Sequence, residues 1–243
     1  MTNKETIINQ FDPNSAGLKD ANIYGLPFSN EDADIIIIPV PWEVTVSYGS
    51  GAAQGPIHVF EASFQVDLFH RQFPNLWKAG IGMDGISEEI KELSENMRPL
   101  AEEIIELHEM AIDLNNHDHG QSLLAQVNDA CEKMNQWVTE RTHFWQSKGK
   151  KVALLGGDHS TPLGYYRALA KAQQPFGILH IDAHMDLRIA YEGFQYSHAS
   201  VMYNAVQIPE VQKLVQVGIR DFCSQEHEVA QQFKDKIEVH YDF

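Results

Sequence analysis

Asp34-Ile35-Ile36-Ile37-Ile38-Pro39-Val40 is the stretch that decides the fold class, because it is a short β-branched run without polar alternation. A strand of this kind is buried on both faces, and burial on both faces indicates a parallel sheet with helices packed over it. A glycine-rich connection follows. Gly55-Pro56 then places a proline in the first turn of a helix that is predicted to run to about His70.

The second half of the chain continues this pattern with a regular alternation of elements. Repeated strand-helix units predict an α/β fold, with three α/β/α layers around a doubly wound, mainly parallel sheet. The predicted strands are residues 152–155, 176–181 and 214–219 and a strand from Ile237, and the predicted helices are at about 162–171, after His198 and near 226–233.

The rest of the chain divides into a polar start and a helical middle. Residues 1–33 are rich in Asn, Asp and Gly and are predicted to form an arm or irregular cover. Residues 34–243 are predicted to form a single α/β domain, with a second short strand near 80–86. The charge-laced apolar pattern at about 87–150 predicts a helical insertion in that domain.

Composition limits the partners of this chain. It carries 34 acidic and 18 basic side chains, a formal charge of −16, which argues against nucleic acid or an anionic membrane and favours a small cationic substrate. The two cysteines, Cys131 and Cys223, cannot build a disulfide framework, and the polar N-terminus lacks the apolar stretch of a signal peptide. We therefore expect a cytoplasmic protein.

Two polar segments follow neighbouring strands of the predicted sheet. Gly156-Gly157-Asp158-His159-Ser160 follows the strand at 152–155, and Asp182-Ala183-His184-Met185-Asp186 follows the strand at 176–181. In open α/β sheets, ligands bind at the carboxyl ends of strands, so the two turns are expected to form one pocket.

The second segment points to a metal. Asp182, His184 and Asp186 point the same way if the backbone is extended, and a divalent cation would relieve both their desolvation and the repulsion between the acids. His159 supplies a fourth ligand, and an oxygen-rich set without thiolate suits Mn²⁺ or another borderline-hard ion better than structural zinc. Taken singly, each residue could equally be a solvated side chain at a strand end.

These two segments resemble the ureohydrolase family of arginases, agmatinases and formiminoglutamases. Pro39-Val40-Pro41-Trp42, the turn from Gly51 to Pro56, and Ser197-His198-Ala199-Ser200 look like that family's first strand, glycine-rich turn and short His motif. The resemblance runs from about Ile35 to the end of the chain and implies an arginase-like fold and a homo-oligomer.

The resemblance also implies a binuclear manganese centre. It assigns His159 and Asp186 to one ion, His184 to the other and Asp182 to a bridge between them. Two cations that share a water lower its pKa enough to supply the hydroxide that attacks an amidine carbon at neutral pH. His198 becomes the acid/base or proton shuttle for the leaving amine, although taken alone it would as often be an ordinary loop or helix histidine.

One departure from the family concerns the C-terminal part. Family members carry a later Asp-x-Asp motif that completes both metal shells and a downstream Glu that helps hold the substrate, and no Asp-x-Asp occurs after His198. We therefore expect a C-terminally incomplete fragment of a longer protein rather than a natural truncation. A chain that ends just as a strand begins would leave part of a parallel sheet uncovered.

The function implied by the resemblance is manganese-dependent hydrolysis of a linear guanidino or formimino C–N bond, with agmatine marginally preferred over arginine and formiminoglutamate. Arg188 could bind a substrate carboxylate, which favours the latter two, whereas a surface pair with Glu192 explains it as well. The alternative is a non-catalytic metal-binding or regulatory member of the family. A nucleotide-binding domain is disfavoured, because no Gly-x-Gly-x-x-Gly opens a helix.

Overall fold

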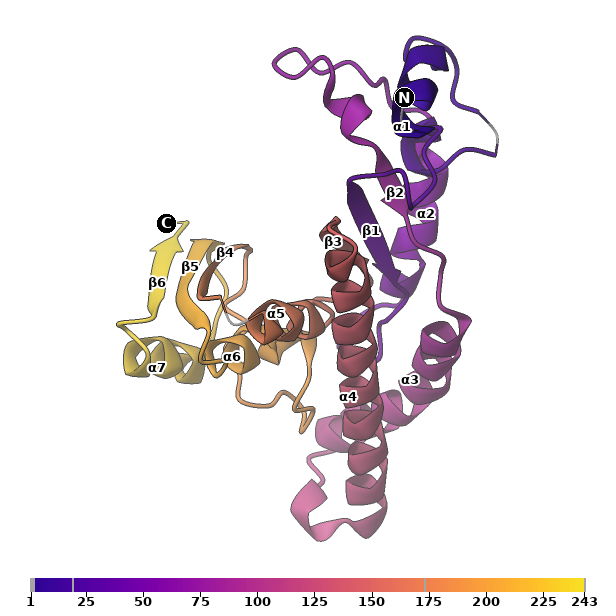
Figure 1. Cartoon of the computed structure of the whole chain (residues 1–243). Coiled ribbons are helices and arrows are strands. Elements are labelled where there is room, and N and C mark those ends of the chain that lie inside the picture. The colour runs from indigo at the N-terminus through magenta and orange to yellow at the C-terminus, as the bar shows by residue number, and fades with distance from the viewer. Residues whose placement is uncertain (1–2, 19, 173, 243) are drawn as a thin grey trace.

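The computed structural model describes residues 3–18, 20–172 and 174–242. Its strands are β1 (Ile35–Val40), β2 (Ile81–Met83), β3 (Lys151–Gly156), β4 (Phe176–Ile181), β5 (Val211–Ile219) and β6 (Ile237–Tyr241). They form two parallel three-stranded ladders, β2-β1-β3 and β4-β5-β6 (Figure 1). The α/β class with parallel strands is confirmed, but the described strands make two ladders rather than one continuous sheet.

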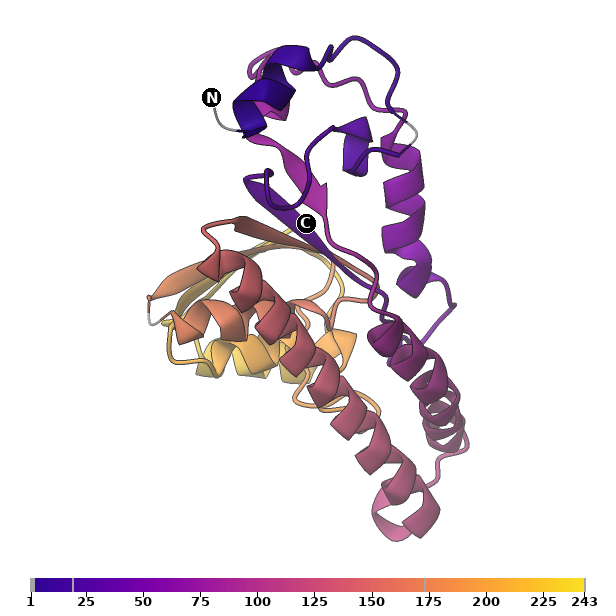
Figure 2. The same ribbon diagram turned by 45° about the vertical axis from the view of Figure 1, so that its right-hand side comes forward.

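Helices cover these sheets. They are α1 (Asn3–Gln10), α2 (Gly55–Ser63), α3 (Glu88–Glu109), α4 (Asp118–Ser147), α5 (Pro162–Lys171), α6 (Val201–Val206) and α7 (Ser224–Gln232), with short 3-10 turns at 23–25, 52–54, 76–79, 114–116 and 198–200. Figure 2 shows α5, α6 and α7 on one side of the β4–β6 sheet and the long α4 crossing beside them. None of the described helices is both long enough and apolar enough to cross a membrane.

The first sheet forms around β1, the central strand of its ladder. Ile36, Ile38 and Val40 are completely buried, as a central parallel strand requires. The helices predicted between 87 and 150 are α3 and α4, and their apolar faces join β1 in the main core through residues such as Ile104 and Met134.

The N-terminal segment differs from the irregular arm that its polarity predicts. Residues 3–10 form α1, and Ile23, Leu26 and Phe28 are buried, because the few apolar residues of this segment close the core beside β2 and α2. The helix predicted to reach His70 ends at Ser63. The Ser63 hydroxyl donates to Phe60 O (2.6 Å) and accepts from Tyr24 N (2.9 Å), so it competes with the helical backbone at that point.

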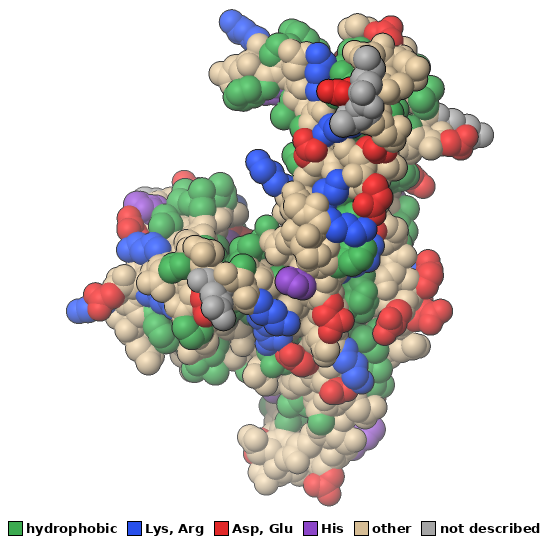
Figure 3. All heavy atoms as spheres, viewed as in Figure 1, with side chains coloured by type: hydrophobic (Ala, Val, Ile, Leu, Met, Phe, Trp, Pro, Cys, Tyr) green, Lys and Arg blue, Asp and Glu red, His purple; other side chains and the backbone are tan. Residues whose placement is uncertain are grey.

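The second sheet is covered unevenly. Ile178 and His180 of β4 face a core completed by α5, α6 and α7, whereas Leu179 and Ile181 on the other face are 66% and 76% exposed. Hydrophobic side chains are visible in Figure 3 at the surface of the part of the molecule that contains β4, β5 and β6. Among the described residues, β3 pairs only with β1 and β4 only with β5, and the turns that follow β3 and β4 build the candidate site.

Candidate metal centre

The turn after β3 presents His159, and its shape depends on glycine. Gly157 N donates to Val40 O (3.0 Å) and Asp158 N donates to Trp42 O (2.8 Å), so the turn lies against the segment that follows β1. A Cβ on Gly157 would fall 1.8 Å from Trp42 O, which no side chain can accommodate. The close approach of these two backbones sets where His159 points.

Asp158 stabilises the same turn from inside. Its Oδ1 accepts hydrogen bonds from both the backbone N–H and the hydroxyl of Ser160. Burial raises the pKa of the Asp158 carboxyl above its ordinary value. Asp158 therefore stabilises the turn by hydrogen bonds within it, while the neighbouring His159 faces the site.

The turn after β4 supplies the two aspartates. Asp182 N donates to Val217 O (3.1 Å) of β5, and Asp182 Oδ1 accepts from His184 N (2.9 Å). Asp186 has a left-handed φ of 53°, and its carbonyl accepts from the N–H groups of Met202 and Tyr203 at the start of α6. The segment is thus bent at Asp186 rather than extended throughout as the alternation predicts, because α6 fixes the backbone there.

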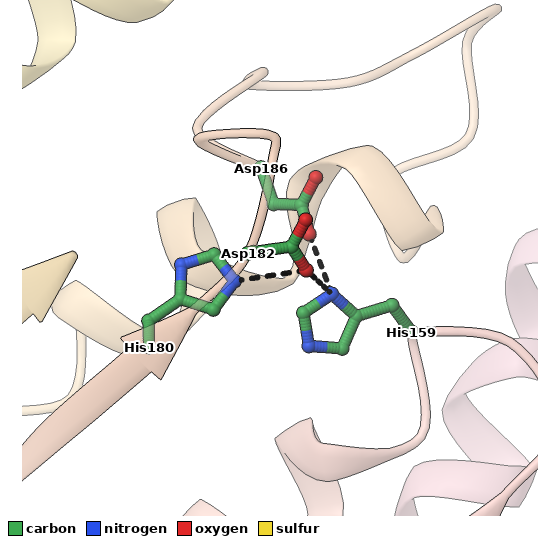
Figure 4. Close-up of side chains that lie close together, drawn as sticks. All are labelled: His159, His180, Asp182 and Asp186. Carbon is green, nitrogen blue, oxygen red and sulfur yellow. Dashed lines mark hydrogen bonds and ion pairs between the residues drawn. The ribbon is translucent and has the colours of Figure 1, made fainter. Parts of the chain in front are cut away.

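Four side chains converge where these turns meet. His159, His180, Asp182 and Asp186 each offer one ligand atom, and these atoms all lie within 4.8 Å of one another (Figure 4). His159 Nδ1 lies 2.7 Å from Asp186 Oδ2 and 3.3 Å from Asp182 Oδ2, while His180 Nε2 lies 3.3 Å from Asp182 Oδ2. The described residues contain this one group with the spacing of a metal site.

The electrostatics of this cluster favour a cation. Burial alone would lower the pKa of the His159 imidazole, but its hydrogen bond to Asp186 and the charges of Asp186 and Asp182 outweigh burial and raise that pKa. Burial would likewise raise the pKa of Asp182, but the His184 N–H and the nearby imidazoles outweigh it and lower that pKa. Two carboxylates around an imidazole are a donor set that fits a divalent cation such as Mn²⁺.

His184 lies beside the cluster, and its ring is 59% exposed. Its Nδ1 is 3.5 Å from Asp182 Oδ1, and its Nε2 is 3.6 Å from Asp221 Oδ2. Asp182 therefore turns one oxygen toward His159 and the other toward His184, which is compatible with the bridging role implied by the family resemblance. The ligand roles of these residues remain predictions.

A cavity of 360 Å³ opens beside the cluster and gathers the other predicted site residues. It brings His184, Asp186 and Arg188 together with His198 from a second chain segment; its lining is Ser47, His184, Asp186, Arg188, Tyr191, His198, Ala199, Asp221, Phe222, Cys223 and Glu226. The His198 ring stands nearly perpendicular to that of Tyr191, with 6.0 Å between the ring centroids. Asp186 of the cluster and His198 therefore line one space.

Arg188 is held within this cavity by Glu226 and Tyr191. Its Nε lies 3.8 Å from Glu226 Oε2, and its guanidinium carbon lies 4.6 Å from the Tyr191 ring centroid. Of the two readings left open for Arg188, the surface ion pair with Glu192 is not seen among the described residues; α7 brings the buried Glu226 close to Arg188 instead. Glu226 also accepts from the backbone N–H groups of Leu187 (3.2 Å) and Cys223 (2.9 Å).

Sequence reasoning missed two of the residues that shape this site. His180 could have been found, since it precedes Asp182 by two residues and a strand places such residues on one face. Nothing in the sequence pointed to Glu226, because it comes from a helix almost forty residues after Arg188.

A larger cavity, of 1070 Å³, lies elsewhere. It is lined mainly by the N-terminal segment and α2, including Leu26, Phe28 and Ile57. None of the predicted ligand or catalytic residues borders it, so its size does not make it the candidate active site.

Comparison with known proteins supports one family. An N(1)-aminopropylagmatine ureohydrolase of Synechocystis sp. is 28% identical over 82% of this chain and 54% of its own length. An agmatinase of Bacillus subtilis is 28% identical over 83% of this chain and 57% of its own length. The chain thus spans about half the length of these relatives.

Solved structures agree in fold. The agmatine ureohydrolase of Thermoplasma volcanium matches with a TM-score of 0.63 and 22% identity, over 98% of this chain and 64% of that one. A Trypanosoma cruzi formiminoglutamase with Mn²⁺ matches with a TM-score of 0.58 and 13% identity, over 88% of this chain and 61% of that one. The arginase family model matches residues 33–241, a range that includes both turns of the candidate metal centre. This chain belongs to the arginase family.

Proposed function

We propose that this chain carries the active site of a metal-dependent hydrolase that cleaves the C–N bond of a small linear guanidino or formimino compound. The observation that carries the proposal is the convergence of His159, Asp182 and Asp186 beside a cavity that also contains His198. Mn²⁺ is the proposed metal, with two ions in a complete site. Membership in the arginase family supports this chemistry.

The protein contributes distinct groups to the reaction. His159, Asp182, Asp186 and His184 would hold the metal, which when bound lowers the pKa of water and so supplies a nucleophile at neutral pH. His198 lines the same cavity and would protonate the departing amine, because an imidazole can act as a general acid. The cavity would place a small substrate next to these groups.

Agmatine or a related guanidino amine is the proposed substrate. The names of the N(1)-aminopropylagmatine ureohydrolase and agmatinase relatives support this choice. Arg188 favours a competing possibility, because an arginine in the cavity is suited to bind the carboxylate of arginine or formiminoglutamate. The choice between these substrates depends on whether Arg188 stays paired with Glu226 when substrate binds.

The setting of the enzyme is proposed on the same basis. We infer a homo-oligomer in the cytoplasm that has no nucleic-acid or membrane partner. The homo-oligomer rests on the family resemblance, the acidic balance of the chain argues against nucleic-acid and anionic-membrane partners, and the cysteines, neither of which is in a disulfide, fit a reducing compartment.

A substrate panel tests the proposal. Urea release from agmatine, N(1)-aminopropylagmatine and arginine, and formamide release from formiminoglutamate, are measured with added Mn²⁺, together with bound manganese by metal analysis. We expect bound manganese and one preferred substrate, loss of both in Asp182→Ala, and no change in the surface variant Asp129→Ala. A wild-type chain that neither binds manganese nor turns over any of these compounds overturns the proposal.

A further inference from the structure

His180 and Gln216 form a buried polar pair within the second sheet. The parallel register places them opposite each other on β4 and β5. His180 is 4% exposed and Gln216 is completely buried, and the same face of the sheet carries the apolar residues Ile178 and Leu214. Burying two polar side chains in an apolar layer costs free energy unless they make hydrogen bonds, so the pair requires a physical reason.

Gln216 permits only one neutral tautomer of His180. The amide Nε2 of Gln216 lies 2.7 Å from Met185 O, an atom that can only accept, so the amide nitrogen rather than the oxygen must occupy this position. The same nitrogen lies 2.9 Å from His180 Nδ1, which therefore accepts the second amide hydrogen. A neutral imidazole whose Nδ1 accepts carries its proton on Nε2.

The protonated Nε2 is directed at the metal cluster. It is buried and makes no hydrogen bond among the described residues, and Asp182 Oδ2, an acceptor, lies 3.3 Å away from it (Figure 4). A ring nitrogen that carries a proton has no lone pair for a metal. Of the four side chains in the cluster, His180 is thus the one that the hydrogen-bond network prevents from ligating a metal directly.

We infer that His180 is a positioning residue, which Gln216 holds in the Nε2-protonated form and which orients the Asp182 carboxylate by a hydrogen bond to Oδ2. The inference rests on the proposed metal site and assigns His180 a role outside the ligand set. Hydrogen bonds of this kind fix the direction of a ligating carboxylate, and their removal commonly lowers metal affinity about 10- to 100-fold.

The tautomer is tested first, in metal-free protein. Nitrogen-15 NMR of the histidine rings is recorded for the wild-type chain, with the His180 signals assigned by their absence in His180→Gln. We expect a protonated Nε2 and an unprotonated Nδ1. In Gln216→Leu, which removes the amide donor, we expect an Nδ1-protonated form to appear. A wild-type ring protonated on Nδ1 overturns the inference regardless of any metal measurement.

Manganese binding is tested next, by the electron paramagnetic resonance signal of free Mn²⁺. We expect His180→Leu to bind the same number of ions as wild type with an affinity about 10- to 100-fold lower. His180→Gln keeps an N–H near the position of Nε2 and should restore the affinity to within about threefold. His240→Leu removes an exposed histidine from β6 of the same sheet and serves as the matched control. Thermal unfolding establishes that each variant is folded.

The outcomes separate this inference from the proposed function. Absence of manganese binding by the wild-type chain overturns the proposed metal site. Binding by wild type that His180→Leu does not weaken overturns only the positioning role. Loss of a whole ion in both His180→Leu and His180→Gln makes His180 a ligand, which also overturns the inference. If His180→Leu does not fold, Gln216→Leu takes its place, with weaker binding as the expected result.

Discussion

His159 Nδ1 lies 2.7 Å from Asp186 Oδ2, and this contact joins the turn after β3 to the turn after β4. The two strands belong to different ladders and are not hydrogen-bonded to each other in the described part of the chain. A histidine and an aspartate 27 residues apart in sequence thus connect the two sheets at the point where the site forms. The same atoms are those that would ligate a metal, so the stability of this junction and metal binding are coupled.

Manganese binding should strengthen with rising pH. The pKa of His159 is raised in the folded protein, so its charged form stabilises the metal-free fold below about pH 6.5, its ordinary pKa. This contribution is lost as the pH rises through the raised pKa, while the neutral ring becomes available as a ligand. Midpoints of thermal unfolding from pH 5.5 to 8.5 should fall without Mn²⁺ and rise with it. In His159→Asn, the fall of the unfolding midpoint with rising pH in the absence of Mn²⁺ should disappear.

Replacement of His198 by alanine should spare the metal and impair turnover. His198 lines the cavity but is not one of the four clustered side chains. We expect kcat on the best substrate to fall about 10²- to 10⁴-fold, as is typical for loss of a general acid, with unchanged manganese content. Full activity in His198→Ala would exclude the acid/base role.

Arg188 should control the response to substrate carboxylates. With Arg188→Met, KM for arginine and formiminoglutamate should rise about 10- to 100-fold, because a charged hydrogen bond contributes about 1.5–3 kcal/mol, while KM for agmatine should change little. Arg220→Met, at a residue that is 57% exposed on the side chain and does not line the cavity, is the control. An equal change for substrates with and without a carboxylate would contradict this assignment.

Gly157 should not tolerate a side chain. In Gly157→Ala, the new Cβ would fall 1.8 Å from Trp42 O, so the turn that carries His159 must shift away from the segment after β1. We expect a loss of at least about 2 kcal/mol in the free energy of unfolding and weaker manganese binding. Gly85→Ala is the matched control, because a Cβ there meets nothing within 4 Å and its stability should stay within about 0.5 kcal/mol of wild type.

Asp84 should stabilise the fold at neutral pH, and this contribution to stability should be lost in acid. Its carboxylate accepts from Arg141 Nη2 (2.8 Å) and Trp145 Nε1 (2.9 Å), both on α4. Burial would raise the pKa of Asp84, but these hydrogen bonds and the Arg141 charge outweigh it and lower that pKa. The contribution is therefore present above about pH 4, the unfolded value, and is lost as pH falls through the lower folded pKa.

Urea unfolding of Asp84→Asn at pH 7 should show a loss of about 2 kcal/mol, because an amide leaves one of the donors without an acceptor. Asp129→Asn breaks an exposed pair with Lys133 on the same helix and should cost less than about 0.5 kcal/mol. Equal losses in the two variants would show that burial of the Asp84 carboxylate contributes nothing.

The amino-acid sequence by itself determined the class of fold and the chemistry of the donor set. The apolar run from Ile35 to Val40 and the later strand-helix alternation predicted the parallel architecture. A strand that is buried on both faces consists of consecutive apolar residues, and this pattern can be seen directly in the sequence. Placing His159, Asp182 and Asp186 in the site likewise required only that ligands bind at the carboxyl ends of parallel strands, although β3 and β4 belong to different ladders.

Only the tertiary structure decided which of these groups meet. The bend at Asp186, the pairing of Arg188 with Glu226 and the buried partnership of His180 with Gln216 all depend on α6, α7 or β5, elements that follow these residues in the chain. Local periodicity describes neighbours in sequence and carries no information about such long-range contacts. For this reason the nature of the site could be predicted from sequence, whereas its hydrogen-bond network could not.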